Sequence, residues 1–414
     1  MPVVRALHLA TERVSPVRLA ALLLLVGLAW RAALATALGW FTQPPASEMY
    51  NVARALAAGD GFADPDGAAS GPTAHVAPVY PLAMSLLLRV VPEPSVPVLL
   101  TCVSILAAST LWALVPMAGR ALGLPARAAL LAGVIGALSP LRYLVELNGA
   151  WDTATSALGL MLLTTLTCLM RDSWTRGWRP LLLGALWGLM CLLQPASLLV
   201  GFACAITFAE AGRDTPAAMR GLALVALAFT LVLAPWTARN SRAFGGLMFV
   251  RGNLGVELSV SNNDGAQPTY RNTWQNPLAR HPHHDPAEFA RRNALGERRY
   301  NAVRMDEAIA WIRTHPSRFI ALTAQRVRLF WLPERGIALL TLLEWLLAFG
   351  ALAGLITLFA ARSEAAPLFA LTWLLFPALY YIVQADERYR YPIEWSLTMA
   401  AGGALHRFLP RGPA

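Results

Sequence analysis

Two acidic residues, Glu48 and Asp152, stand at the starts of predicted helices, where acid–base chemistry could be placed. Ser47 can cap a short helix from Glu48 to Ala58. A carboxylate there can act as a general base towards a hydroxyl or an amine, although acids also occur in first helical turns for stability alone. Asp152 follows a short turn, and it could instead serve only to cap the helix after it. Each carboxylate therefore has a catalytic and a structural interpretation.

Arginine is the second residue type with possible chemistry. Arg388 and Arg390 lie one residue apart in the polar segment 386–392, directly before an apolar block. A guanidinium group matches phosphate oxygens at two points, so this pair could bind a lipid phosphate. The alternative is a loop in which the arginines neutralise the adjacent Asp386 and Glu387.

Histidine occurs where metal binding is conceivable, but its spacing is a weak signal. His281, His283 and His284 are a compositional hint only, and His75 lies alone in the Gly- and Pro-rich stretch 67–81. The four cysteines lack metal-site spacing. The sequence has no glycine-rich phosphate loop and no dinucleotide fingerprint. We therefore expect no metal, no cofactor and no nucleotide as direct donor.

The elements that position these residues are predicted to cross a membrane. Of 414 residues, 56% are hydrophobic and 14% are charged, against roughly 25% charged in soluble domains. The apolar blocks 18–41, 95–118 and 337–361 reach the length of about 20 residues that a bilayer core requires. The net charge is +10 and every basic residue is arginine. Because these arginines lie between apolar blocks, the lipid bilayer and not nucleic acid is the expected partner.

We predict an all-α integral membrane protein with ten transmembrane helices. Gln194-Pro195 indicates a tight turn between the fifth and the sixth, and one kinked span is the alternative. Short arginine-bearing loops fall on one side, which predicts that both termini are cytoplasmic. The expected location is the bacterial inner (cell) membrane. The ten spans lie near 18–41, 95–118, 126–147, 152–170, 181–193, 196–210, 221–236, 337–360, 367–383 and 392–406.

The spans divide the chain into three parts. Residues 1–236 form an N-terminal transmembrane module with a first outer loop at 42–94, residues 237–336 form a long extracytoplasmic segment, and residues 337–414 form a C-terminal transmembrane module. The segment 237–336 is predicted to begin as turn-rich chain over 245–284. A helix then runs from Asp285-Pro286 towards His315-Pro316, and a surface helix follows over Pro316–Trp331. Arg142 and Glu146, four residues apart, are expected to pair on one helix.

Several short stretches, in order along nearly the whole chain, resemble the GT-C superfamily of membrane glycosyltransferases. The nearest branch is the family 39 type, which includes protein mannosyltransferases and the lipid A aminoarabinose transferase. The resembling stretches are Glu48–Phe62, Gly71–Pro81, Ala150–Thr153, Pro235–Asn240 with Phe244-Gly245, Asn253–Leu258, Asn262-Asn263, Gly296-Glu297, His315-Pro316 and Arg388–Ile393.

This resemblance implies a specific reaction. Such enzymes move a sugar from a polyprenyl-phosphate carrier to an acceptor on the outer face of the membrane, usually with inversion. Glu48 matches the acidic position of the family by its spacing to Tyr50 and Ala53, whereas Ala46-Ser47 stand where many members carry further acids. Glu48 is thus the expected base and Asp152 the next. The expected substrate-binding residues are Tyr50, His75, Tyr80, Arg239, Asn240, Arg388 and Arg390.

Two other classes of protein fit part of the pattern. A transporter or lipid flippase usually places charged or broken-helix features near the bilayer midplane, often within internal repeats. A non-catalytic protein could also retain the same fold. A pocket that joins Glu48 to Arg388 at the outer rim favours the enzyme, and a central water path across the membrane favours the transporter. The acceptor, whether lipid, glycan or protein, stays open.

Overall fold

The computed structural model describes residues 15–209, 215–273, 275 and 278–408. Regular structure in these ranges is helical, and the strand-like pairings among them are two isolated bridges, Ala63 with Pro72 and Thr269 with Ala385. The predicted all-α class is confirmed. Arg5, Arg13, Arg213 and Arg411, which support the orientation prediction in part, lie outside the described residues.

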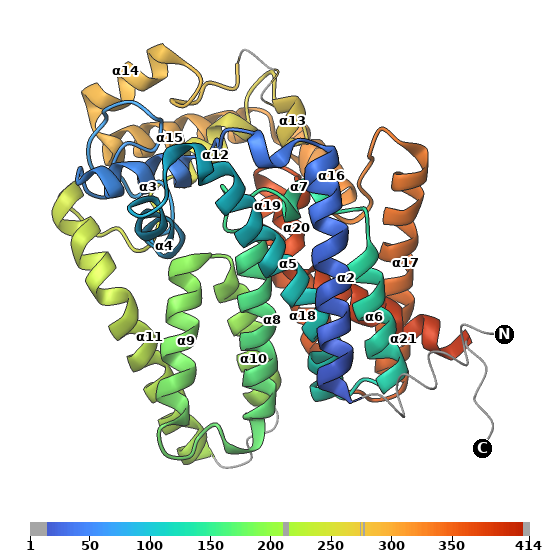
Figure 1. Ribbon diagram of the computed structural model, residues 1–414. Helices are drawn as coiled ribbons and strands as arrows, with labels where there is room; N and C mark the ends of the chain where they lie inside the picture. Colours follow the sequence, from blue (N-terminus) through green and yellow to red (C-terminus); the bar gives the residue numbers. More distant parts are fainter. Residues whose placement is uncertain (1–14, 210–214, 274, 276–277, 409–414) are drawn as a thin grey trace, which may run out of the picture.

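Apolar helices form a bundle that fills the lower two thirds of the molecule in Figure 1. Their composition explains the arrangement, since helices this apolar on most sides are stable only inside a protein or in lipid. The bundle helices are α2 (Pro16–Ala37), α5 (Val96–Ala121), α6 (Ala126–Leu138), α8 (Thr153–Leu169), α9 (Arg179–Leu193), α10 (Ser197–Ala209), α11 (Thr215–Phe244), α17 (Ala338–Ala360), α18 (Ala365–Leu375) and α21 (Glu394–Phe408).

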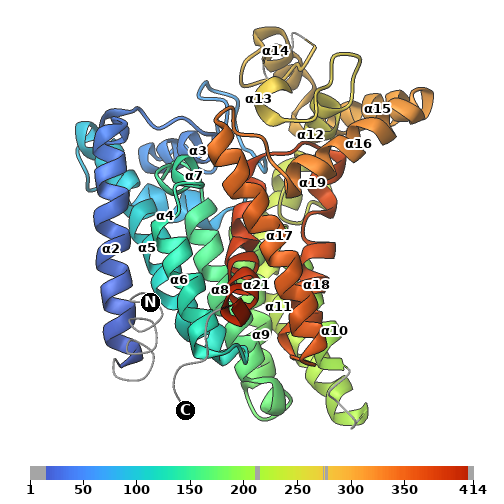
Figure 2. The same cartoon turned by 90° about the vertical axis from the view of Figure 1, so that its right-hand side faces the viewer.

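The other α-helices gather at one end of this bundle, as Figure 2 also shows. We call this end the loop face. Its helices are α3 (Glu48–Ala58), α4 (Val79–Leu88), α7 (Tyr143–Glu146), α12 (Leu254–Ser261), α13 (Tyr270–Thr273), α14 (Pro286–Leu295), α15 (Glu297–Thr314), α16 (Pro316–Trp331), α19 (Ala378–Ile382) and α20 (Glu387–Arg390).

Five helical stretches in the described ranges are long and apolar enough to cross a membrane, and they coincide with the first, second, seventh, eighth and ninth predicted spans. The ninth, Ala365–Ile382, comprises α18 and α19 together. The third to sixth predicted spans are apolar helices of 10–17 residues, and the tenth is α21, with 15 residues. A helix rises about 1.5 Å per residue, so these five are shorter than a bilayer core of about 30 Å. The structure therefore does not confirm ten spans.

The chain forms two helices around Gln194-Pro195, as predicted. Helix α9 ends at Leu193 and α10 begins at Ser197. In Figure 1 the chain reverses its direction between them. Pro195 explains the break, because its ring removes a backbone donor and clashes with the preceding turn.

Several predicted boundaries need correction. The span at 126–147 is instead α6, which ends at Leu138, then an irregular segment and the short α7. Helix α11 continues to Phe244, past the predicted module boundary at 236, with Pro235 inside it. The stretch 245–284 contains α12 and α13. The helix expected from Asp285 to His315 is broken at Gly296, whose φ of +75° ends α14 and precedes α15.

Two glycines allow close approach between bundle helices. A Cβ atom at Gly354 of α17 would lie 1.8 Å from the carbonyl oxygen of Ala400 in α21. A Cβ atom at Gly184 of α9 would lie 2.2 Å from the carbonyl oxygen of Val225 in α11. Small residues of this kind are the usual means of packing apolar helices in membranes.

The expected pair of Arg142 and Glu146 does not form. Arg142 contacts Glu344 of α17 and Glu394 of α21, and Glu146 instead accepts a hydrogen bond of 2.8 Å from Arg31 of α2. Arg142 lies before α7 in the irregular segment that interrupts the predicted helix, so the two side chains do not share a helix face. These buried contacts join distant bundle helices, and spacing within one helix does not predict them.

Candidate active site

A cavity of about 370 Å³ lies where the loop face meets the bundle. The first outer loop, the turns before α8 and α10, the start of α12, and α19 and α20 all contribute to its wall. Its charged and ionisable lining residues are Glu48, His75, Asp152, Arg251, Glu257, Tyr270, His281, Tyr380, Arg388 and Tyr389. The cavity thus joins Glu48 to Arg388, and it also contains Asp152.

A network of short contacts fixes the two acids that the sequence singled out. The Ser47 hydroxyl accepts a hydrogen bond of 3.0 Å from the amide of Tyr50, which caps α3 as predicted and holds Glu48 in the first turn. The same hydroxyl donates to the carbonyl of Ala150 at 2.7 Å. Asp152 follows two residues later and accepts a hydrogen bond of 2.7 Å from the Ser156 hydroxyl. The start of α3 and the turn before α8 are thereby held together.

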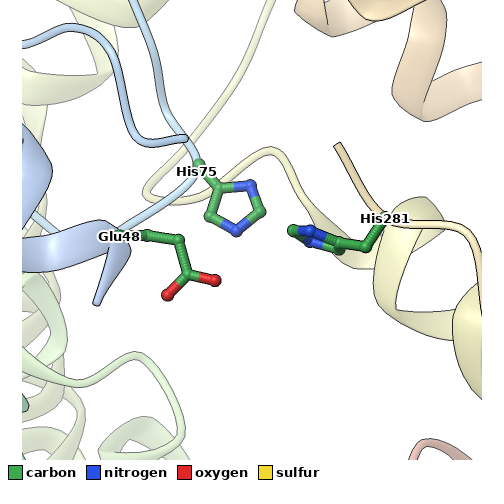
Figure 3. A group of neighbouring side chains, drawn as sticks. All are labelled: Glu48, His75 and His281. Carbon is green, nitrogen blue, oxygen red and sulfur yellow. The ribbon is translucent and has the colours of Figure 1, made fainter. Parts of the chain in front are cut away.

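Glu48, His75 and His281 form a cluster (Figure 3). One ligand atom from each residue lies within 4.8 Å of the others, and the two imidazole rings meet edge to face with centroids 5.6 Å apart. Both histidines are buried. From sequence, His75 is a binding residue only by the resemblance, and His281 is only a weak metal hint. The fold brings both to Glu48.

The protonation states of the cluster follow from burial and charge. Burial lowers the pKa of His281 to about 4, and burial together with neighbouring His281 and Arg251 lowers the pKa of His75 well below its usual range. Burial alone would raise the pKa of Glu48, but His281 and a backbone hydrogen bond outweigh it and lower the net pKa. At neutral pH the cluster therefore holds a carboxylate and two neutral imidazoles, which is the form that binds divalent metals.

Arg388 projects into the cavity from a cage of aromatic rings. Its guanidinium carbon lies 4.3 Å from the ring centroids of both Trp151 and Tyr270, and 5.0 Å from that of Tyr389. One nitrogen donates to the Tyr389 hydroxyl at 3.1 Å, and Nε lies 3.7 Å from a carboxylate oxygen of Asp386. A stacked guanidinium of this kind keeps donors in its plane that can reach an oxyanion.

Sequence reasoning missed two charged residues of the cavity. Arg251 donates from Nε to the carbonyl of His75 at 2.8 Å, and Glu257 in α12 accepts a hydrogen bond of 3.0 Å from the Asn253 side chain. Burial raises the pKa of Glu257. The resembling stretch Asn253–Leu258 was the available signal for Glu257, whereas Arg251 lies just before it, in a segment predicted only as turn-rich chain.

Four other predicted binding residues lie outside the cavity wall and hold the loop face together. Tyr80 donates to the carbonyl of Gly149 at 2.8 Å, and Asn240 donates to the carbonyl of Phe249 at 3.3 Å. Arg239 donates to the carbonyls of Thr73 and Phe62 at 2.6 and 2.7 Å.

Tyr50 is buried in α3 within the apolar core. In the structure these four residues have positioning contacts, and none lines the space next to Glu48.

Arg390 also lies outside the cavity, although Arg388 is only two residues away. It is 2% exposed and contacts Glu344 at 2.5 Å and Glu394 at 3.0 Å. The expected convergence of Arg388 and Arg390 on one ligand is not what the structure shows. The two side chains leave the short α20 towards different surroundings, one in the cavity and one in the bundle.

Comparisons with known proteins bear on the fold. No family model matches the chain, and no curated protein sequence matches it. Two solved structures of the Archaeoglobus fulgidus oligosaccharyltransferase do. The complex with Zn and sulfate matches at 14% identity and a TM-score of 0.54, covering 94% of this chain and 49% of that one. The apo form matches at 12% identity and a TM-score of 0.55, covering 96% and 51%.

The chain thus spans about half the length of the oligosaccharyltransferase that it matches. At this identity the likeness shows the fold alone, and the GT-C superfamily that the sequence motifs resemble stays a prediction. The family 39 branch stays a prediction. The chain thus shares its helical fold with about half of that oligosaccharyltransferase.

Proposed function

We propose that the protein is a membrane glycosyltransferase that takes a sugar from a polyprenyl-phosphate carrier and transfers it, with inversion, to an acceptor of the cell envelope. The observation that carries this proposal is the single cavity that joins Glu48 to Arg388. It combines an ionised carboxylate with two guanidinium groups, those of Arg251 and Arg388. Transfer from a phosphate leaving group requires this combination of a base and fixed positive charge.

The reaction that we propose balances as follows. A carboxylate takes the proton from an acceptor hydroxyl or amine, whose oxygen or nitrogen attacks the anomeric carbon of the sugar. The bond between that carbon and the phosphate oxygen breaks, and its electron pair leaves with the lipid phosphate. Arg251 and Arg388 stabilise the added negative charge. A charge-assisted contact of this kind contributes about 1.5–3 kcal/mol.

Glu48 is the proposed base and Asp152 the second candidate. Glu48 lines the cavity and stays ionised at neutral pH, because its neighbours lower its pKa. Asp152 has one oxygen occupied by the Ser156 hydroxyl. A carboxylate has a second oxygen that can take a proton or accept a hydrogen bond from a sugar hydroxyl. Asp152 therefore belongs in every mutational test.

The cluster of Glu48, His75 and His281 also fits a divalent metal ion, contrary to our expectation from sequence. One carboxylate and two neutral imidazoles are a ligand set that zinc accepts. A metal held by these three side chains would supply a Lewis acid next to the phosphate or the acceptor. In that case Glu48 would be a ligand, and Asp152 would become the base.

Chelation separates these two roles of Glu48. If Glu48 is the base, the purified protein keeps its activity after treatment with EDTA, and Glu48→Gln abolishes it. If Glu48 is a ligand, EDTA abolishes activity and added zinc restores it, and Asp152→Asn also abolishes transfer. Measuring bound zinc by mass spectrometry in the parent and in His281→Ala reports on the site without any activity assay.

The position of the cavity also bears on the transporter alternative. Its polar residues belong to the loop face and to the adjoining ends of bundle helices, such as the turn after α9. A second hollow of about 350 Å³, between α8 and α9, is lined by apolar side chains. Neither resembles a polar path at mid-membrane depth, so the enzyme is the better proposal.

The function is tested in a strain that lacks the gene. Mass spectrometry compares its envelope glycans and glycolipids after complementation with the parent, with Glu48→Gln and with Glu93→Gln. Glu93 is an exposed acid in the same outer loop and serves as the matched control. We expect a sugar-modified species with the parent and the control and its loss with Glu48→Gln. If all three strains give the same species, the proposal fails.

A further inference from the structure

A buried cluster of charges lies beside the cavity, and the proposed reaction does not use it. It joins three arginines to three glutamates: Arg142, Arg335 and Arg390 with Glu344, Glu387 and Glu394. The formal charges of these six side chains sum to zero. Burying charges is costly in desolvation even when they are paired, so a cluster of this size calls for a reason other than stability.

Glu344 is the centre of this cluster. It lies in α17 and is fully buried. Arg142 contacts both of its oxygens, Arg335 donates from Nε and Nη2 at 2.8 and 2.6 Å, and Arg390 donates from Nη2 at 2.5 Å. One carboxylate thereby connects the segments before α7, between α16 and α17, and at the end of α20.

These contacts hold the residues on both sides of Arg388. Glu387 accepts a hydrogen bond of 2.5 Å from Arg335. Arg390 bonds to Glu344 and Glu394, and also to the carbonyls of Phe330 and Trp331 at 3.0 and 3.1 Å. Arg388 itself does not contact Glu344.

The segment needs this support. Helix α20 has four residues, and a helix so short has no stability of its own. Tyr389 stacks on Tyr380 with ring centroids 4.5 Å apart, which fixes one more side chain of the segment. The backbone between Asp386 and Tyr391 is thus anchored from the bundle side, while Arg388 alone of its basic residues faces the cavity.

We propose that Glu344 is a positioning residue that holds the segment 386–391 so that Arg388 reaches the phosphate of the lipid-linked donor. The identity of the ligand, a lipid phosphate, rests on the proposed function. The link from Glu344 to the segment 386–391 does not. Glu344 acts through Arg335, Glu387 and Arg390 and touches no substrate. Its loss should therefore matter for binding only while Arg388 is present.

The test uses the full-length protein in lipid nanodiscs, with farnesyl phosphate as the probe. We compare four forms: the parent, Glu344→Gln, Arg388→Ala and the double variant. Glu334→Gln is the matched control, because Glu334 pairs with Arg328 on the surface. We expect Glu344→Gln to weaken binding about tenfold in the parent and less than twofold in the Arg388→Ala background. The control should bind as the parent does.

Hydrogen exchange gives a readout that needs no ligand. The backbone amides of 386–391 should exchange faster in Glu344→Gln and unchanged in Glu334→Gln. Equal weakening of binding in both backgrounds would overturn the proposal, as would unchanged exchange in a folded Glu344→Gln protein. If Arg388→Ala binds farnesyl phosphate as the parent does, the proposed phosphate site is wrong, and the exchange result alone decides the role of Glu344.

A second variant covers the case in which Glu344→Gln does not fold. Glu387→Gln removes one carboxylate at the edge of the cluster, where the side chain is partly exposed, and leaves Glu344 with its three arginines. We expect faster exchange of the same amides and a smaller loss of binding, again absent in the Arg388→Ala background. Exchange identical to the parent in this variant would refute the link.

Discussion

Arg388 and Arg390 are separated by a single residue, and the structure predicts different consequences when each is replaced by alanine. Arg388 faces the cavity within a cage of three aromatic rings, whereas Arg390 is 2% exposed among two glutamates and two backbone carbonyls. Arg388→Ala should therefore act mainly on ligand binding. Arg390→Ala should act mainly on stability, and it should weaken binding only indirectly, through the segment 386–391.

The magnitudes follow from the contacts. Losing one charge-assisted contact to phosphate costs about 1.5–3 kcal/mol, which weakens binding roughly 10- to 150-fold at about 1.4 kcal/mol per factor of ten. The three aromatic contacts of Arg388 are worth about 0.5–1 kcal/mol each, so its effect on unfolding should be smaller than that of Arg390→Ala. Arg390→Ala leaves the cluster with three glutamates and two arginines, Arg142 and Arg335, so one buried negative charge is uncompensated. Breaking a buried pair in this way costs about 3–5 kcal/mol.

Two measurements on each variant separate these effects. Binding of farnesyl phosphate to the protein in nanodiscs reports on the cavity, and thermal unfolding in detergent reports on the bundle. Arg388→Lys keeps the charge but loses the planar contact, so it should recover only part of the affinity. Arg313→Ala is the control, because Arg313 is an exposed arginine on the loop face.

One result would refute the reasoning about Arg388. If Arg388→Ala binds the probe as tightly as the parent and Arg313→Ala does the same, the phosphate is held elsewhere. Arg251 is then the better candidate, since it is the other arginine of the cavity wall. If Arg390→Ala unfolds at the parent's temperature, the buried pairs contribute nothing net.

Three further outcomes are expected. Glu48→Gln should abolish transfer with unchanged thermal unfolding, and near-parent turnover would move the role of base to Asp152. Replacing exposed Asp306 and Arg176 by cysteine, in a protein without its native cysteines, should allow labelling by a membrane-impermeant reagent from opposite sides; labelling from one side would contradict the predicted orientation. Gly354→Leu should lower the free energy of unfolding by about 1–3 kcal/mol or more, because a Cβ atom there meets the backbone of α21 at 1.8 Å; an unchanged melting temperature would contradict that packing.

The sequence predicted the helices better than their ends. The length of the apolar blocks predicted α2, α5, α11 and α17. Residue type alone predicted the Ser47 cap and the break at Pro195. The extension of α11 to Phe244 was not predictable from sequence. The polar residues at its end indicate the end of a membrane span, but they do not show whether the helix itself continues. The end of α6 at Leu138 does have a local signal that the predicted span passed over, because Pro140 disfavours a helical conformation at Ser139.

The site was predictable only in part, and for a physical reason. Glu48, Asp152 and Arg388 are visible because each stands at a helix start or in a polar segment beside an apolar one. His281 and Arg251 are brought to the cavity by contacts across the loop face, such as the bond from Arg251 to the carbonyl of His75. For Arg390 the sequence prediction of a ligand site failed. Its residue type and its position fit such a site, but its carboxylate partner Glu344 comes from a distant helix that local sequence does not reveal.

The short bundle helices have a consequence for the surrounding lipid. Helices α6 and α10 have 13 residues each and α9 has 15, which corresponds to roughly 20–23 Å at 1.5 Å per residue. Where they cross a bilayer of about 30 Å, the hydrophobic mismatch is relieved by local thinning or by headgroups that sink along the helix ends. The turn between α9 and α10 borders the cavity. A lipid-borne phosphate on that side therefore meets the protein below the average headgroup plane. The thickness of the host membrane then affects how readily the lipid carrier enters the cavity.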